Sequence, residues 1–252
     1  MDVQKVQFQW IKGPSYQQIW DLQTSLQKSL IELKRSAASQ EELSSERGFH
    51  HHLLFCEHNP VYTLGKSGKE SHLLIPEEIL KKEGVELFRI NRGGDITFHG
   101  PGQITGYPIF DLENFFTDVH KYVRYLEEAV IRLLASYQLE GIRLKDYTGV
   151  WLPPGNGQSK YRKICAIGVH LSRWVTMHGF ALNVNTDTSW FERIIPCGIG
   201  DVDKSVTSLC AETGREHSLE DIGDKLLMEL ANLFGFEWFR MEVSHQNVLY
   251  KK

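Results

Sequence analysis

Apolar residues near the start of the chain follow two different spacings. Val6, Phe8 and Trp10 alternate with polar residues, which predicts an opening strand. From Pro14-Ser15 onward the spacing widens to three and four residues, which predicts an amphipathic helix. The apolar face of this helix consists of Ile19, Leu22, Leu26, Leu30 and Leu33.

Shorter segments follow the helix. Small and polar residues fill Ser36–Gly48, which predicts a solvated connection. Residues 50–65 predict a strand followed by a loop. Residues 76–84 predict a short helix between a proline and a glycine, and residues 85–90 predict another strand.

The second half of the chain contains longer elements. The pattern predicts a helix over 118–139, strands over 141–152, 163–172 and 175–184, and a surface turn over 153–162. Ser218 with Asp221 resembles a capping box and predicts the start of the last helix, which ends near Gly235. Strands come in runs, and helices lie at both ends and in the middle. This order favours one α+β domain over residues 1–252, with helices on one side of a sheet.

Composition excludes several classes of function. The chain has 252 residues, 41% of them apolar and 24% charged, with a formal charge of −4 and a pI near 6.3. These values are typical of a globular domain and argue against binding to nucleic acid. No apolar run is long enough to cross a membrane, and the N-terminal residues lack the pattern of a targeting signal. The four cysteines are scattered, which indicates reduced thiols in the cytoplasm.

One glycine-rich stretch stands out from the alternating pattern. Between Arg92 and Leu112, five glycines and two prolines are interleaved with Asp95, His99 and Gln103. Glycine adopts backbone shapes closed to other residues and lets a ligand approach the main chain. The stretch therefore predicts a ligand-binding loop.

Two residues farther along the chain could carry nucleophilic chemistry. Cys197 lies between Pro196 and Gly198, and Lys163 opens an apolar strand. A nearby cation lowers the pKa of a thiol, so this pair could form an activated nucleophile. Each residue alone is equally consistent with a structural role: a small cysteine in a turn, and a lysine at a strand entrance.

Histidines and metals offer weaker signals. His99 and His178 each precede a glycine, and either could orient a substrate or transfer protons, although a structural role fits each one separately. The chain has no HExxH and no paired Cys/His spacing, and His50, His51 and His52 fall in an alternating strand. The sequence therefore predicts no metal site.

Four motifs in order resemble the octanoyltransferases of lipoate biosynthesis: RGGDITFHGPGQ, KICAIG, HGFALNVN and PCGI. The resemblance implies a mixed, largely antiparallel sheet flanked by helices, similar to the catalytic domain of biotin- and lipoate-protein ligases. It also implies transfer of an octanoyl group from octanoyl-acyl carrier protein to a lysine of lipoyl domains, in 2-oxoacid dehydrogenase and glycine-cleavage proteins, without a cofactor.

Site roles follow from the same resemblance. Cys197 would be the thioester nucleophile, Lys163 would lower its pKa and transfer protons, and His178 would be auxiliary. Substrate contacts would come from Arg92, Gly93, Gly94, Asp95, Ile96, Thr97, Phe98, His99, Ala166, Ile167, Gly168, Gly179, Phe180 and Ala181. Cys165 departs from the expected small residue and is a candidate off-pathway acyl acceptor. A basic rim for acidic partners would use Arg89, Arg92, Arg143, Lys145, Lys160 and Arg162.

Three alternatives remain at this point. An ATP-dependent lipoate- or biotin-protein ligase would share the fold but would form an acyl-adenylate and would not need Cys197. A non-catalytic docking protein for lipoyl domains would have no use for a thiol in that loop. A cysteine hydrolase would normally pair its cysteine with histidine, whereas this chain offers a lysine. The chain also lacks GxGxxG and GxxxxGK[ST].

Overall fold

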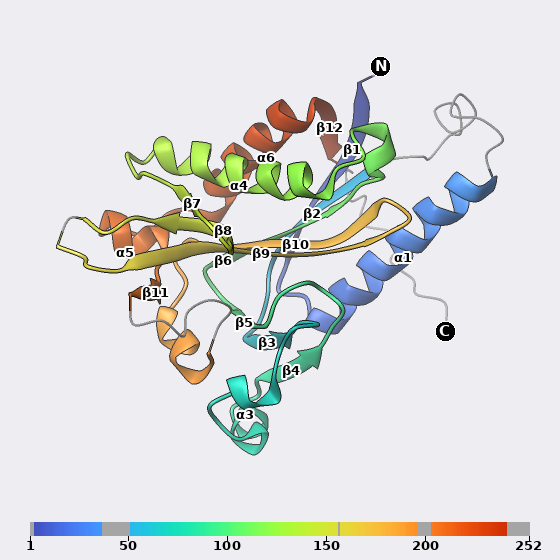
Figure 1. Cartoon of the computed structure of the whole chain (residues 1–252). Coiled ribbons are helices and arrows are strands. Elements are labelled where there is room, and N and C mark those ends of the chain that lie inside the picture. Colours follow the sequence, from blue (N-terminus) through green and yellow to red (C-terminus); the bar gives the residue numbers. More distant parts are fainter. Residues whose placement is uncertain (1–2, 37–50, 156, 196–202, 241–252) are drawn as a thin grey trace.

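The computed structural model describes residues 3–36, 51–155, 157–195 and 203–240. Its strands form one large and one small sheet (Figure 1). The strands are β1 (Gln4–Lys12), β2 (His51–Glu57), β3 (Val61–Leu64), β4 (Glu86–Arg89), β5 (Ile96–His99), β6 (Gln103–Ile109), β7 (Ile142–Leu144), β8 (Tyr147–Leu152), β9 (Tyr161–Ser172), β10 (Val175–Asn183), β11 (Lys204–Val206) and β12 (Phe236–Arg240).

The large sheet has the order β12-β1-β2-β6-β10-β9-β8-β7, and β11 pairs with β9. β1 is parallel to both of its neighbours, and β11 is parallel to β9. The other neighbours in this sheet are antiparallel. The small sheet has the order β4-β3-β5 and also combines both kinds of pairing. The prediction of a mixed, largely antiparallel α+β sheet is therefore confirmed.

Helices begin and end where their capping residues predict. The helices are α1 (Tyr16–Ser36), α3 (Glu77–Lys82), α4 (Val119–Ala135), α5 (Leu209–Thr213) and α6 (Leu219–Phe234), with short 3-10 turns η1 (Glu70–His72), η2 (Leu112–Asn114) and η3 (Thr188–Arg193). The Ser218 side chain accepts a hydrogen bond from the Asp221 amide, and Gly235 ends α6 in the left-handed conformation. None of the helices in the described ranges is both long and apolar enough to span a membrane.

Helices cover both faces of the large sheet, so the expectation of helices on one side is wrong. On β2, Leu53 and Phe55 pack with α4 and α6, whereas Leu54 and Cys56 face α1 (Figure 1). Successive side chains of a strand point to opposite faces, so a strand buried on both sides is apolar throughout. The run of apolar residues in β2 is therefore the sequence pattern that indicates helices on both faces.

The sequence pattern missed five strands. β5 and β6 lie in the stretch predicted as a ligand-binding loop, and β11 lies where no element was predicted. Residues 61–64, expected in a loop, form β3 at the centre of the small sheet. Residues 236–240 form β12 after the last predicted helix and pair with β1. The predicted connection at Ser36–Gly48 lies outside the described residues, apart from Ser36 at the end of α1.

A β-bulge in β9 changes which side chains share a face. Val150 pairs with Cys165, but the next residue of β8, Trp151, pairs with Lys163. Ile164 is therefore the extra residue. Alternation alone would place Lys163 on the face of Cys165. The bulge instead brings it to the same cavity as Ala166, while Ile164 and Cys165 enter the core under α4 and α6.

A buried carboxylate supports the strand opposite this bulge. Glu127 of α4 is fully buried, accepts a hydrogen bond from the Gly149 amide at 3.0 Å, and pairs with Arg143 at 3.0 Å. Gly149 has φ +114°, and a β-carbon there would collide with the carbonyl of Cys165. Gly149 and Glu127 together allow β8 to approach the bulged part of β9.

Glu127→Ala should lower the free energy of unfolding by about 2 kcal/mol or more. It leaves the buried Gly149 amide without a hydrogen-bond acceptor and opens a cavity. Glu128→Ala is the matched control, since Glu128 also binds Arg143 but is partly exposed. Glu128→Ala should lower the free energy of unfolding by at most about 1 kcal/mol. Urea unfolding measures both, and equal losses would contradict a special role for Glu127.

Candidate active site

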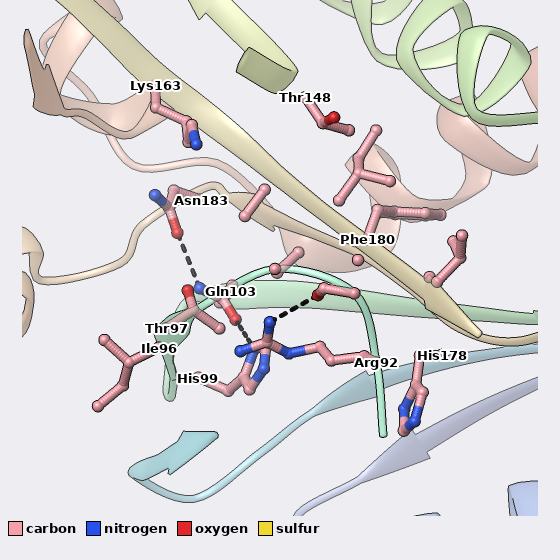
Figure 2. A pocket seen from close by; sticks show the side chains of 18 of the residues that line it. Arg92, Ile96, Thr97, His99, Gln103, Thr148, Lys163, His178, Phe180 and Asn183 are labelled. Carbon is pink, nitrogen blue, oxygen red and sulfur yellow. Dashed lines mark hydrogen bonds between the residues drawn. The ribbon is translucent and has the colours of Figure 1, made fainter. Parts of the chain in front are cut away.

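A cavity of about 430 Å³ lies between the glycine-rich run, β9 and β10. Most of the sequence-predicted site residues line it: Arg92, Gly93, Gly94, Ile96, Thr97, His99, Lys163, Ala166, Ile167, Gly168, His178, Gly179, Phe180 and Ala181. Figure 2 shows Lys163 and Asn183 toward one end of the cavity and His178 toward the other. The structure thus brings together residues that lie up to 89 positions apart.

Two residues of the predicted set lie off the cavity. Asp95 accepts a hydrogen bond from the ring of His72, and it also accepts one from the amide of Ile96. Phe98 is fully buried and stacks on Trp190 with ring centroids 5.1 Å apart. Asp95 therefore fixes the loop, and Phe98 anchors β5 in the small sheet's core.

The sequence analysis did not predict the other residues that line the cavity, most of which lie outside the recognised motifs. They are Tyr16 of α1, Gln103 and Tyr107 of β6, Val123 of α4, Asp146, Tyr147 and Thr148 near β8, Val169 of β9, Asn183 of β10, Phe191 of η3 and Val206 of β11. Gln103 and Asn183 were visible inside the recognised motifs. The others show only ordinary core or loop patterns.

Glycines allow the loop at Arg92 to lie directly on β9. The Gly93 amide donates to the carbonyl of Val169 at 3.0 Å. A β-carbon at Gly168 would lie 2.7 Å from the carbonyl oxygen of Gly93. Main chain therefore forms this wall of the cavity, as expected for a glycine-rich binding loop.

Arg92 and His99 belong to a buried hydrogen-bonded network. The Arg92 guanidinium donates to the carbonyl of Thr63 at 2.6 Å and to its hydroxyl at 3.0 Å. His99 Nε2 lies 3.3 Å from the same hydroxyl, and its Nδ1 lies 2.8 Å from Gln103 Oε1. Burial, and then the neighbouring charges, lower the pKa of His99 to about 3. His99 is therefore a neutral hydrogen-bonding group.

His178 is held at the opposite end of the cavity. Its Nε2 lies 2.8 Å from Asn91 Oδ1, and its amide donates to Gln23 of α1 at 3.0 Å. Burial, followed by the charge on Arg92, lowers the pKa of His178 to about 3. It is not protonated near neutral pH.

Lys163 is nearly buried, with 9% of its surface exposed. Its Nζ lies 4.6 Å from the centroid of the Trp151 ring, a cation–π contact that helps to hold the amine. Its carbonyl accepts a hydrogen bond from the Thr207 amide at 3.0 Å. The lysine is thus fixed both through its side chain and through its backbone.

Cys197 lies outside the described residues, but the chain on both sides of it is described. Before it, the Ile195 amide donates to the carbonyl of His72 at 2.8 Å. After it, β11 runs parallel to the start of β9, with Val206 opposite Lys163. The described chain thus stops at Ile195 and resumes at Asp203, directly before the strand that pairs with residues 161–163.

Cys165 does not face the cavity. Its side chain is fully buried in the core under α4 and α6, and burial raises the pKa of its thiol. A protonated, inaccessible thiol is a poor nucleophile. The bulge separates Cys165 from Lys163, although only Ile164 lies between them in sequence.

The expected basic rim is much reduced. Arg89, Arg143 and Arg162 each pair with glutamates, and Arg92 is buried. Lys145 and Lys160 remain as exposed cations without an ion pair among the described residues.

Comparison with known proteins places this site in a family. The family description "Lipoyl protein ligase A/B catalytic domain" matches residues 16–231. The chain belongs to this family. Among relatives, an octanoyltransferase of Cytophaga hutchinsonii is 53% identical over 221 residues, covering 87% of this chain and 88% of that protein. An octanoyltransferase of Flavobacterium johnsoniae is 52% identical over 234 residues, covering 92% and 98%.

Solved structures of lipoate-protein ligases confirm the fold. A bi-partite lipoate protein ligase from Thermoplasma acidophilum superposes with a TM-score of 0.63 at 17% identity, covering 96% of this chain and 88% of that one. A lipoate-protein ligase A bound with ATP gives a TM-score of 0.62 at 16% identity, covering 96% and 90%. Both proteins thus share the fold of this chain at low sequence identity.

The buried histidines should make stability depend on pH. The pKa values of His99 and His178 are lowered to about 3, and that of His58 to about 4. An unfolded histidine has a pKa of about 6.5, so below that pH the unfolded chain binds more protons than the native one. The free energy of unfolding should therefore fall as pH drops from about 6.5 to 4.5, by up to about 1.4 kcal/mol per pH unit and histidine.

Urea unfolding at several pH values measures this slope. His99→Gln should reduce the slope by about one histidine's share. His120 is exposed, so His120→Gln should not change the contribution of the buried histidines to this slope. A stability that is flat between pH 4.5 and 6.5 would contradict the assignment of neutral buried histidines.

Proposed function

We propose that this protein is an octanoyltransferase that forms a thioester on Cys197. The observation that carries the proposal is the Lys163 amine held at one end of a cavity lined by Ile96, Ile167 and Phe180. An apolar chain fits such a lining, and the amine can serve both a thiol and an incoming lysine. The identity of 50% or more to octanoyltransferases supports the same activity.

In the first half-reaction the Cys197 thiolate attacks the carbonyl of octanoyl-acyl carrier protein. A new carbon–sulfur bond forms, the bond to the carrier sulfur breaks, and the carrier leaves as a thiol after taking up a proton. The positive charge of Lys163 would lower the pKa of Cys197 and stabilise its thiolate. The proton that the carrier needs can come from Lys163.

The second half-reaction transfers the chain to a lysine of a lipoyl domain. The acceptor amine attacks in its neutral form, Lys163 takes its proton, and Cys197 leaves as a thiolate. An amide replaces a thioester, which is a downhill exchange, so the reaction requires no ATP. The acceptors we propose are the lipoyl domains of 2-oxoacid dehydrogenase and glycine-cleavage proteins.

The whole chain would act as one catalytic domain, in the cytoplasm. A reaction that depends on a reduced Cys197 suits a reducing compartment. Among the described residues, Cys56, Cys165 and Cys210 are free thiols. With Lys145 and Lys160 as the remaining cations, shape and backbone contacts would contribute more than charge to binding of the two protein partners.

An ATP-dependent ligase is the strongest alternative, because the fold occurs in lipoate ligases. Such an enzyme would activate a free acid as an adenylate and would not require a cysteine. A lysine that lines the cavity, in a chain that also carries the PCGI cysteine, favours the transferase. The two activities differ in their need for ATP.

Mixing the protein with octanoyl-acyl carrier protein, without ATP, should add one octanoyl group to Cys197. Intact mass and peptide mapping measure the adduct, and a lipoyl domain should discharge it. Cys197→Ala should abolish the adduct. Cys165→Ala is the control and should retain it, since Cys165 is buried in the core. Modification that appears only with ATP and free octanoate would support the ligase instead.

Chain length should be selected only moderately. Each methylene buried in the cavity contributes about 0.8 kcal/mol, and a pocket distinguishes neighbours by about 1–3 kcal/mol per methylene. Hexanoyl- and decanoyl-carrier protein should therefore react more slowly than octanoyl-carrier protein, in both directions from the optimum. Competition assays with mixed donors measure the ratio of kcat/KM values. Equal values for all three donors would contradict selection of chain length by the cavity.

A further inference from the structure

Asn183 ends a chain of buried hydrogen bonds that runs beneath the cavity. The chain starts at Arg92 and passes through Thr63, His99 and Gln103 before it reaches Asn183. All five residues are at least nine-tenths buried. Figure 2 shows the bond between Gln103 and Asn183 on the Lys163 side of the cavity.

Backbone carbonyls fix the orientation of both amide side chains. Gln103 Nε2 donates to the Phe98 carbonyl at 3.2 Å, which leaves Gln103 Oε1 to accept from His99. Asn183 Nδ2 donates to the Thr207 carbonyl at 3.0 Å, which leaves Asn183 Oδ1 to accept from Gln103 at 2.8 Å. Neither amide can be flipped without placing two donors or two acceptors face to face.

One N–H of Asn183 therefore remains for the cavity. An amide nitrogen carries two hydrogens, and Thr207 takes one of them. Within the described residues, the second has no acceptor, and Asn183 lines the cavity. The same residue, Thr207, donates its amide to the Lys163 carbonyl at 3.0 Å, so Asn183 and the lysine strand are joined through it.

We propose that this second N–H binds the carbonyl oxygen of the acyl group and stabilises the oxyanion of both half-reactions. The inference rests on the proposed thioester at Cys197. As the bond to sulfur forms, the carbonyl electron pair moves onto oxygen, where Asn183 donates a hydrogen bond. The pair returns when the carbon–sulfur bond to the leaving group breaks. A donor held in place before the reaction needs no reorganisation.

A neighbouring asparagine provides a matched control. Asn185 lies two residues farther along the same motif, and its amide also bonds backbone groups, donating to the His217 carbonyl at 2.7 Å and accepting from the His217 amide at 3.0 Å. Asn185 does not line the cavity. Loss of either amide removes local hydrogen bonds, but only Asn183 would act on the carbonyl.

Single-turnover acylation with octanoyl-acyl carrier protein tests the proposal. Asn183→Ala should acylate about 100-fold or more slowly than the wild type, the usual loss for one oxyanion donor. Asn185→Ala should stay within about threefold of the wild type, since a group remote from the carbonyl adds no transition-state stabilisation. A fast Asn183→Ala variant, or equal losses in both variants, would overturn the inference.

Binding of octanal separates stabilisation of the oxygen from simple damage to the cavity. A thiol adds to the aldehyde to form a hemithioacetal, whose tetrahedral carbon and oxygen mimic the intermediate. Asn183→Ala should bind octanal at least tenfold more weakly and octan-1-ol equally well, because only the adduct places an oxygen on Asn183. Equal weakening of both ligands would overturn the inference.

Asn183→Asp provides a second route if the alanine variant does not fold. It keeps the shape and still accepts from Gln103, but an ionised carboxylate has no N–H. It should lose as much acylation rate as expected for alanine, and a wild-type rate would overturn the inference. A wild-type protein that forms no acyl adduct would instead refute the proposed function itself, which distinguishes the two failures.

Discussion

The extra residue in β9 is the constraint on which the cavity depends. If β9 ran through Ile164 without a bulge, regular alternation would direct Lys163 to the same side as Cys165, into the apolar layer under α4 and α6. A charged amine would be costly there. The bulge gives both residues suitable surroundings, because the thiol is buried and the amine reaches the cavity. Gly149 and Glu127 maintain the arrangement from the neighbouring strand and from α4.

Polar groups under the cavity behave as one oriented unit. Arg92 supplies donors at one end, and the carbonyl of Thr207 receives the last donor at the other. Each intermediate side chain both accepts and donates, so the position of every proton follows from its neighbours. His99 fits this role because burial keeps it neutral. A histidine that titrated near neutral pH would reverse one link and disrupt the rest.

The sequence predicted the elements with regular periodicity and the residues within recognisable motifs. Helices α1, α4 and α6 and most of the cavity wall were found in this way. Tyr16, Val123 and Phe191 were missed, because each lies on an element whose pattern reports only burial. Asp95 and Phe98 were placed on the cavity because they lie inside a functional motif. In the structure, one holds the loop to His72 and the other holds β5 in its sheet.

The position of β1 between β12 and β2 has a consequence for folding during synthesis. Residues 4–8 cannot pair with residues 236–240 until that distant segment has left the ribosome. Until then, one edge of β1 presents unpaired amides and carbonyls next to apolar side chains, a surface that favours aggregation. Pairings between such distant parts of a chain also form slowly. We therefore expect the nascent chain to depend on chaperones until β12 is available to cover that edge. For the same reason, refolding of the purified protein should require slow dilution.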